Sequence, residues 1–206
     1  YGNSSMWSSG TWYLAKVKAM DSASPNNESS PESISFVFDN SLPSSYIAYP
    51  TNTAILNTVP TISGTADDLP SGTNAGLEAV KISILNVTTT KYYDGTAFQS
   101  NTEVFFDVNG LTNWTYECPA LASGSKYRIR TKAIDQAGNS ESLGAGNTFR
   151  FDDTLPVSTI TYPTNDALVN TGLTTISGTA DDTGTNPGEV TNVQILIKRI
   201  ADTMYY

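Results

Sequence analysis

The chain has 206 residues, of which 38% are hydrophobic, and a formal net charge of −9. Its acidic surface would repel nucleic-acid backbones, and no apolar run approaches the roughly 20 residues that cross a bilayer, so we expect neither a nucleic-acid partner nor a transmembrane segment. The sequence has no His and a single Cys, Cys118, which excludes Ser-His-Asp and Cys-His active sites and an intrachain disulfide.

Apolar and polar residues alternate with a period of two along the chain, and this pattern predicts β-strands. Near the start, Tyr13, Ala15 and Val17 place an apolar residue at every second position. Asp94-Gly95, which follows a Tyr pair and precedes Phe98, predicts a hairpin turn. The middle of the chain contains the clearest strand-like segments, at 46–56, 59–66, 79–87, 90–99, 102–108, 112–117, 124–134 and 146–152.

The sequence repeats itself at a nearly constant spacing. Tyr-Pro-Thr-Asn at 49–52 recurs at 162–165, a spacing of 113 residues. Val-Lys-Ile-Ser-Ile at 80–84 aligns with Val-Gln-Ile-Leu-Ile at 193–197, again at 113. Further blocks toward both ends of the chain also recur, and their spacing differs from 113 by at most a single residue. A period of this kind indicates tandem domains, each one a folding unit that stacks on its neighbours.

The phase of this repeat divides the chain into three parts. We expect the C-terminal part of one repeat at 1–43, a complete repeat at 44–156 and the N-terminal part of a further repeat at 157–206. Partial repeats would leave sheet edges unpaired, so the tail of one copy could complete the head of the next and propagate a filament. The alternative is that these boundaries are cut points in a longer chain, whose neighbouring repeats are then the partners.

Three segments resemble fibronectin type III and bacterial Ig-like domains. Leu-Ala-Ser-Gly-Ser-Lys-Tyr at 121–127 resembles the turn before their sixth strand, where a Tyr hydroxyl bonds to upstream backbone. The segment 133–139 resembles the loop between their last two strands, and 152–156 resembles their inter-repeat linker. The resemblance covers the whole chain, and it implies an all-β fold of tandem Ig-like, fibronectin III-like β-sandwich repeats of about 113 residues.

Repeats of that family occur in large bacterial surface proteins and adhesins. The resemblance therefore implies an extracellular, cell-surface or secreted protein that acts as a rigid stalk, spacer or filament subunit, and we expect no enzyme. The alternative is an adhesin or carbohydrate-binding module. Tyr92, Tyr93 and Phe98 are the candidates for stacking on surface glycans, and packing within a hairpin is the other explanation for them.

Acidic residues are expected to gather at one pole of each sandwich, because the entering linker and two loops meet there in folds of this family. Neighbouring carboxylates repel one another, and a bound divalent cation reverses the sign of that energy. Calcium suits such a site because it takes six to eight oxygen ligands, and the resemblance implies that it stiffens the junction. The alternative is that these side chains cap turns. The candidate ligands are Asp39, Asp67, Asp68, Asp135, Asn139, Asp152, Asp153, Asp181 and Asp182.

Overall fold

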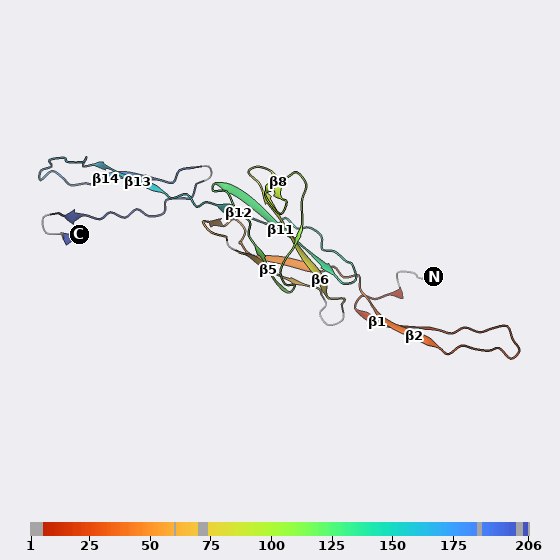
Figure 1. Ribbon diagram of the computed structural model, residues 1–206. Helices are drawn as coiled ribbons and strands as arrows, with labels where there is room; N and C mark the ends of the chain where they lie inside the picture. Colours follow the sequence, from red (N-terminus) through yellow and green to blue (C-terminus); the bar gives the residue numbers. More distant parts are fainter. Residues whose placement is uncertain (1–5, 60, 70–73, 185–186, 201–203, 206) are drawn as a thin grey trace.

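The computed structural model describes residues 6–59, 61–69, 74–184, 187–200 and 204–205, and its regular structure is β throughout (Figure 1). Two sheets make up the middle of the molecule. The first has three strands, in the order β10 (Asn113–Glu117), β5 (Thr61–Asp67) and β3 (Ser44–Tyr49). No helix in the described part of the chain is long and apolar enough to cross a membrane.

The second sheet is larger and is built around the antiparallel pair β6–β11. Its neighbouring strands are antiparallel except for β4, which runs parallel to β12. A further short strand, β9 (Phe106–Asp107), pairs with β6. The order along the sheet is β4 (Ile55–Leu56), β12 (Asn147–Phe151), β11 (Ser125–Asp135), β6 (Leu77–Asn86), β7 (Lys91–Tyr93) and β8 (Phe98–Ser100).

The two sheets enclose one core, which is filled by the inward parity of each strand. On β11 the buried and outward residues alternate along the strand, as the period of two predicts. Trp114 of β10 lies over Gly64 of β5, where an added Cβ would come within 2.2 Å of the Trp114 ring. The buried apolar residues are Ile47, Ile62, Ala66, Val80, Ile82, Ile84, Trp114, Tyr127, Ile129, Ala133, Phe149 and Phe151. The molecule is therefore an all-β protein with a β-sandwich at its centre.

Two of the predicted strands are each divided in the structure. The segment predicted at 46–56 becomes β3 and β4, which belong to different sheets. The segment predicted at 90–99 becomes the hairpin β7–β8, with Gly95 at a φ of 103° in its turn. Asp94 holds this turn, because its Oδ1 accepts the backbone N–H groups of Thr96 and Ala97. Hydrogen bonds, that from Ala97 first, hold the pKa of Asp94 below its ordinary value.

Separate hairpins extend from opposite ends of the sandwich (Figure 1). At one end β1 (Thr11–Val17) pairs with β2 (Glu32–Phe38). At the other, β13 (Val157–Tyr162) pairs with β14 (Ser177–Asp181), followed by the short pair β15 (Lys198–Arg199) and β16 (Met204–Tyr205). The segment 193–197, which aligns with part of β6, forms no strand.

The outer hairpins reproduce the strand registers of the sandwich. Tyr13 lies opposite Phe36 as Tyr127 lies opposite Phe149. The β13–β14 pair likewise repeats the register and the bulge of β3–β5. The backbone bond expected for the Tyr hydroxyl is present twice, since Ala122 N–H donates to Tyr127 and Ser8 N–H donates to Tyr13, each at 2.8 Å. The sequence repeat therefore has a counterpart in local backbone geometry.

Candidate metal centre

Three carboxylates meet where the N-terminal hairpin joins the sandwich. Asp39 follows β2 in the linker, Asp68 follows β5, and Asp135 ends β11. One oxygen of each lies within 4.8 Å of the other two. The three side chains are only 9%, 3% and 0% exposed, respectively. Among the described residues this is the one group of three acidic, Cys or His side chains close enough to hold a metal ion.

Asp39 connects the linker to the segments on both sides of it. Its Oδ1 accepts the Ser9 hydroxyl at 2.8 Å and the Ser41 N–H at 2.9 Å, and its Oδ2 accepts the Ala75 N–H at 2.7 Å. Burial acts to raise the pKa of Asp39, but these hydrogen bonds outweigh it and the pKa lies below the ordinary value. Asp39 is therefore ionised at neutral pH.

Asp135 is held by the loop that follows it. Its Oδ1 accepts the backbone N–H of Asn139 and its Oδ2 accepts the Asn139 side-chain amide, both at 2.7 Å. The same Asn139 nitrogen donates to the backbone oxygen of Asp39 at 3.1 Å. Asn139 thus faces the cluster with its amide nitrogen, and it orients two of the three acidic residues.

Asp68 differs from the other two because one of its oxygens has no partner. Its Oδ2 accepts the Gly76 N–H at 2.9 Å, while its Oδ1 is buried without a hydrogen bond from any described residue. Burial first, and then the negative charges of Asp39, Asp135 and Asp67, raise the pKa of Asp68. A carboxylate pair at this spacing repels by roughly 3 kcal/mol at an effective dielectric of 20. A cation among the three would remove that repulsion and give the unpaired oxygen a partner.

The other end of the sandwich carries part of the same arrangement. Asp152 accepts the Ser123 hydroxyl at 3.0 Å, the Thr154 N–H at 3.1 Å and the Gly188 N–H at 2.5 Å, which matches the three bonds of Asp39. Asp182 corresponds to Asp68 in the repeat, and its Oδ1 is likewise buried without a hydrogen bond from any residue that the structure describes. This second junction therefore presents two of the three carboxylates.

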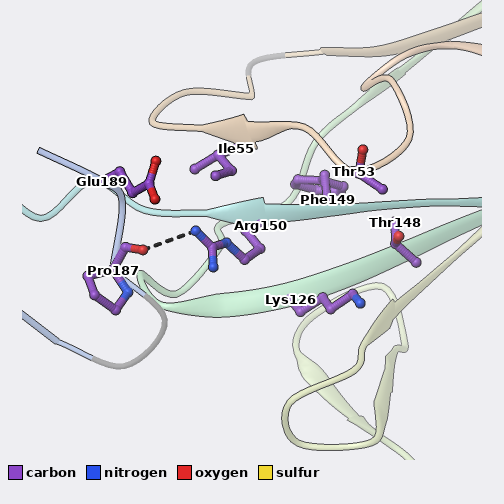
Figure 2. Close-up of a pocket in the computed structure, with 8 residues that line it drawn as sticks. All are labelled: Thr53, Ile55, Lys126, Thr148, Phe149, Arg150, Pro187 and Glu189. Carbon is purple, nitrogen blue, oxygen red and sulfur yellow. Dashed lines mark hydrogen bonds between the residues drawn. The ribbon is translucent and has the colours of Figure 1, made fainter. Parts of the chain in front are cut away.

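A pocket of about 510 Å³ opens beside the second junction (Figure 2). Arg150 donates from Nη2 to the backbone oxygen of Pro187 at 3.0 Å, which ties β12 to the segment after β14. Thr53, Ile55, Lys126, Thr148, Phe149, Arg150, Pro187 and Glu189 line it. The pocket lies at a contact between two parts of the chain, and it contains one acidic side chain.

The remaining predicted ligands lie outside the three-carboxylate cluster. Asp67 is exposed, and its Oδ1 accepts the N–H of Asp68 at 2.8 Å, which is a local turn contact. Asp153 and Asp181 are exposed as well. Sequence reasoning missed Ser9 and Ser123, whose hydroxyls reach the linker aspartates. Their matching places before Gly10 and Gly124 in the repeat were a usable signal.

Of the three aromatic side chains considered for glycan stacking, Tyr93 and Phe98 take part in packing, while the Tyr92 hydroxyl accepts a hydrogen bond from Arg128 at 3.5 Å. The ring of Tyr93 lies 5.4 Å from Phe98 and 5.6 Å from Phe106, measured between centroids, and Phe98 lies 5.2 Å from Tyr127. All four side chains are buried or half-buried. Their faces therefore extend the core beneath the β7–β8 hairpin.

Comparison with known proteins assigns neither a family to this chain nor a function to these residues. No family model matches the chain, and no curated protein matches it. The site must therefore be interpreted from its own chemistry, in which hard oxygen ligands gather without any His or Cys beside them. That ligand set favours a hard cation such as calcium over zinc.

Proposed function

We propose that this chain is a segment of tandem Ig-like, fibronectin III-like β-sandwich repeats, which acts as a rigid spacer or stalk in an extracellular or cell-surface protein and binds calcium at its repeat junctions. The observation that carries the proposal is the Asp39, Asp68 and Asp135 cluster with its unpaired buried oxygen. Spacer function follows from the position of the cluster, because it joins a linker to the loops of the next sandwich.

Recurrence of the same contacts supports the tandem arrangement. The linker aspartate, the Tyr hydroxyl bond and the strand registers each appear twice at the repeat spacing. A fourth recurring feature lies in the loop after β1, where Asp21 accepts the backbone and side-chain N–H groups of Asn27 at 2.9 and 2.7 Å. The hydrogen bonds within this pair match those between Asp135 and Asn139. Each part of the chain therefore contains some of the contacts that form the first junction.

Turn capping explains part of the cluster but not all of it. The oxygens of Asp39 and Asp135 accept N–H or O–H groups, as capping carboxylates do. Capping gives no reason for three carboxylates to lie within 4.8 Å of one another, or for Asp68 Oδ1 to be buried without a donor. Buried charge needs a counter-charge or a strong partner. Calcium supplies both, with backbone and water oxygens available to complete its coordination.

The position of Asp39 gives calcium a mechanical effect. This residue already contacts Ser9 in the N-terminal part and Ala75 in the sandwich. A cation held by Asp39, Asp68 and Asp135 would add a direct link between the linker and two loops of the sandwich. Each such link restricts rotation at the junction, and repeated along an array it yields a stiff rod.

Thermal unfolding of the full chain with calcium or with a chelator tests this function. Calcium at about 100 times its Kd stabilises by about 2.7 kcal/mol, which raises the Tm of a chain of this size by about 5–10 °C. Asp68→Asn is expected to abolish that shift. In chelator its Tm equals or exceeds that of the wild type, because a buried like charge has been removed.

Asp67→Asn is the matched control, since Asp67 is the exposed neighbour and should leave the calcium shift intact. The proposed calcium site is rejected if millimolar calcium leaves the wild-type Tm unchanged. It is equally rejected if Asp67→Asn removes the shift as completely as Asp68→Asn does.

A further inference from the structure

Basic side chains of this acidic protein gather on the outward face of the large sheet. The chain contains 11 Lys and Arg residues against 20 Asp and Glu residues. Six of the basic residues occupy outward positions on three adjacent strands of the sandwich, β6, β11 and β12. The sandwich therefore forms this face from its own strands. The six residues are Lys81, Lys126, Arg128, Arg130, Lys132 and Arg150.

The protein itself neutralises two of these six charges. Arg130 donates from Nε to Glu103 Oε1 at 2.9 Å and forms an ion pair with the same carboxylate. Lys81 forms an ion pair with Asp107. The other four basic side chains form no ion pair with any residue that the structure describes. The face therefore keeps an excess of positive charge.

Three of the unpaired cations lie side by side. Lys126 is directly opposite Arg150 across β11 and β12, and Arg128 is directly opposite Thr148. Directly opposite side chains have Cβ atoms about 5 Å apart, and outward neighbours along one strand are about 7 Å apart. Lys126, Thr148 and Arg150 also line one pocket (Figure 2), where Glu189 is the acidic side chain. Three positive charges and a hydroxyl thus lie within one small area.

The two arginines keep donors that the described residues leave unused. The Nε–H groups of Arg128 and Arg150 are buried without an acceptor from the described part of the chain. Arg128 Nη2 makes a long bond of 3.5 Å to the Tyr92 hydroxyl, and Arg150 Nη2 donates to one backbone oxygen. A buried donor without an acceptor destabilises the protein, and guanidinium groups bind planar oxyanions through two donors at once. An acidic ligand would give both arginines the acceptors they lack.

Tyr92 places an aromatic ring beside the three cations. It lies opposite Leu85, which lies opposite Arg128, so the three residues form one row on the outward face. Unlike Tyr93 and Phe98, the half-buried Tyr92 has no ring contact with another described aromatic side chain. An aromatic ring packs on the apolar face of a sugar, while Lys and Arg bind acidic groups. The combination suits a sugar that carries an acid.

We propose that this basic face, formed by Lys126, Arg128, Arg150, Thr148 and Tyr92, binds an acidic glycan, a polysaccharide whose sugars carry carboxylate or sulfate groups. The three cations bind the acidic groups, the Thr148 hydroxyl accepts a hydrogen bond from a sugar hydroxyl, and the Tyr92 ring packs against the sugar. The acidic remainder of the surface repels the same ligand. Binding is therefore confined to the basic face.

The position of the face within the sheet favours a glycan over an acidic peptide. β11 has β12 and β6 on its two sides, and β12 lies between β11 and β4. Their backbone groups are therefore engaged in the sheet, and an extended peptide cannot add to the face as a further strand. A ligand on the face meets side chains alone. Acidic groups surrounded by hydroxyls satisfy Lys, Arg, Thr and Tyr together.

Calorimetric titration of the full chain with acidic polysaccharides tests the proposal. Polygalacturonate carries carboxylates and dextran sulfate carries sulfates, so the two arms distinguish the sources of the acid. Each titration contains chelator, because calcium would bridge an acidic glycan to the acidic junctions. The wild type should bind at least one of the two polymers, with an affinity that falls as the salt concentration rises. Neutral dextran should not bind.

Substitutions on the face locate the ligand. Lys126→Gln and Arg128→Gln should each weaken binding by about tenfold, because each removes a charge-assisted hydrogen bond. Lys126 is exposed, so its variant should keep the wild-type Tm. Tyr92→Ala should weaken binding by about fivefold, while Tyr92→Phe keeps the ring and most of the affinity. Lys16→Gln is the matched control, because it removes the same charge from an exposed side chain of β1, outside the sandwich.

Three outcomes would overturn the proposal. One is a wild type that binds neither acidic polysaccharide at low salt. Another is a Lys16→Gln variant that loses as much affinity as Lys126→Gln, since binding would then follow net charge alone. The third is polyglutamate or duplex DNA that binds as tightly as the polysaccharides, to Tyr92→Ala as well as to the wild type, which would identify the ligand as an acidic peptide or a nucleic acid. The calcium function is tested separately, by the Tm shift that Asp68→Asn removes.

Discussion

The segments 80–84 and 193–197 share one sequence pattern and adopt different structures. The first belongs to β6, where Val80, Ile82 and Ile84 are at most 2% exposed. The second forms no strand, and its apolar side chains are 46–69% exposed. Alternation places apolar groups on one face, but a strand exists only when a neighbour accepts and donates its backbone hydrogen bonds. In the sandwich β11 is that neighbour.

Hairpin registers and turn bonds show the opposite behaviour. The β13–β14 pair keeps the register of β3–β5, although β13 is exposed to solvent along its whole length. The β1–β2 pair likewise keeps the register of β11–β12. Each of these pairs forms within one part of the chain, so its register is kept where the other strands of the sandwich are not present beside it.

The largest expected difference between the two regions comes from one matched pair of core deletions. Ile84→Ala should lower the free energy of unfolding by about 2–5 kcal/mol, because it leaves a cavity among fully buried neighbours. Ile197→Ala should change it by less than about 0.5 kcal/mol, because its side chain is already in water. Urea unfolding at a concentration that keeps the chain monomeric measures both. Equal losses would show that residues 193–197 are buried in solution.

A second matched pair concerns the carboxylate that ties the two sheets together. Glu141 accepts the Ser45 and Ala133 N–H groups, each at 2.9 Å, and so connects β3 to β11. Glu141→Ala should cost about 2–3 kcal/mol, because two backbone donors lose a charged acceptor. In the N-terminal part Ser29 takes the place of Glu141, because its hydroxyl accepts the Ala19 N–H at 2.9 Å. The neighbouring Glu28 forms an exposed ion pair with Lys18, so Glu28→Ala should cost less than about 0.5 kcal/mol. The same urea titration applies, and a Glu28 effect as large as that of Glu141 would contradict the comparison.

The smallest effect is the pH response of Asp68 in chelator. Its pKa is raised above the ordinary 3.8, with burial as the leading cause. The folded state therefore holds this proton at a pH where the unfolded state has lost it, and stability gains from this group as pH falls from the folded pKa toward 3.8. Wild type should gain stability relative to Asp68→Asn over that window. Parallel pH profiles for the two proteins would mean that Asp68 carries no raised pKa.

The candidate site shows how far sequence reasoning extends. The repeat spacing and the family resemblance pointed to the linker and the two loops that bring Asp39, Asp68 and Asp135 together. They did not separate Asp68 from Asp67, because adjacent residues in a turn point in directions that depend on backbone conformation. The structure makes that distinction, since Asp68 is 3% exposed and Asp67 is exposed to solvent.

The sequence by itself determined the strand periodicity, the repeat spacing, the Asp94-Gly95 hairpin and the Tyr127 hydroxyl bond, because each of these depends on residues close together in the chain. Only the tertiary structure decided that 46–56 divides between two sheets and that 193–197 is left without a strand partner. Those outcomes depend on which segments, distant from one another in the sequence, come into contact. A local sequence pattern does not determine those contacts. The unpaired oxygen of Asp68 belongs with them, because its burial is produced by three segments at once.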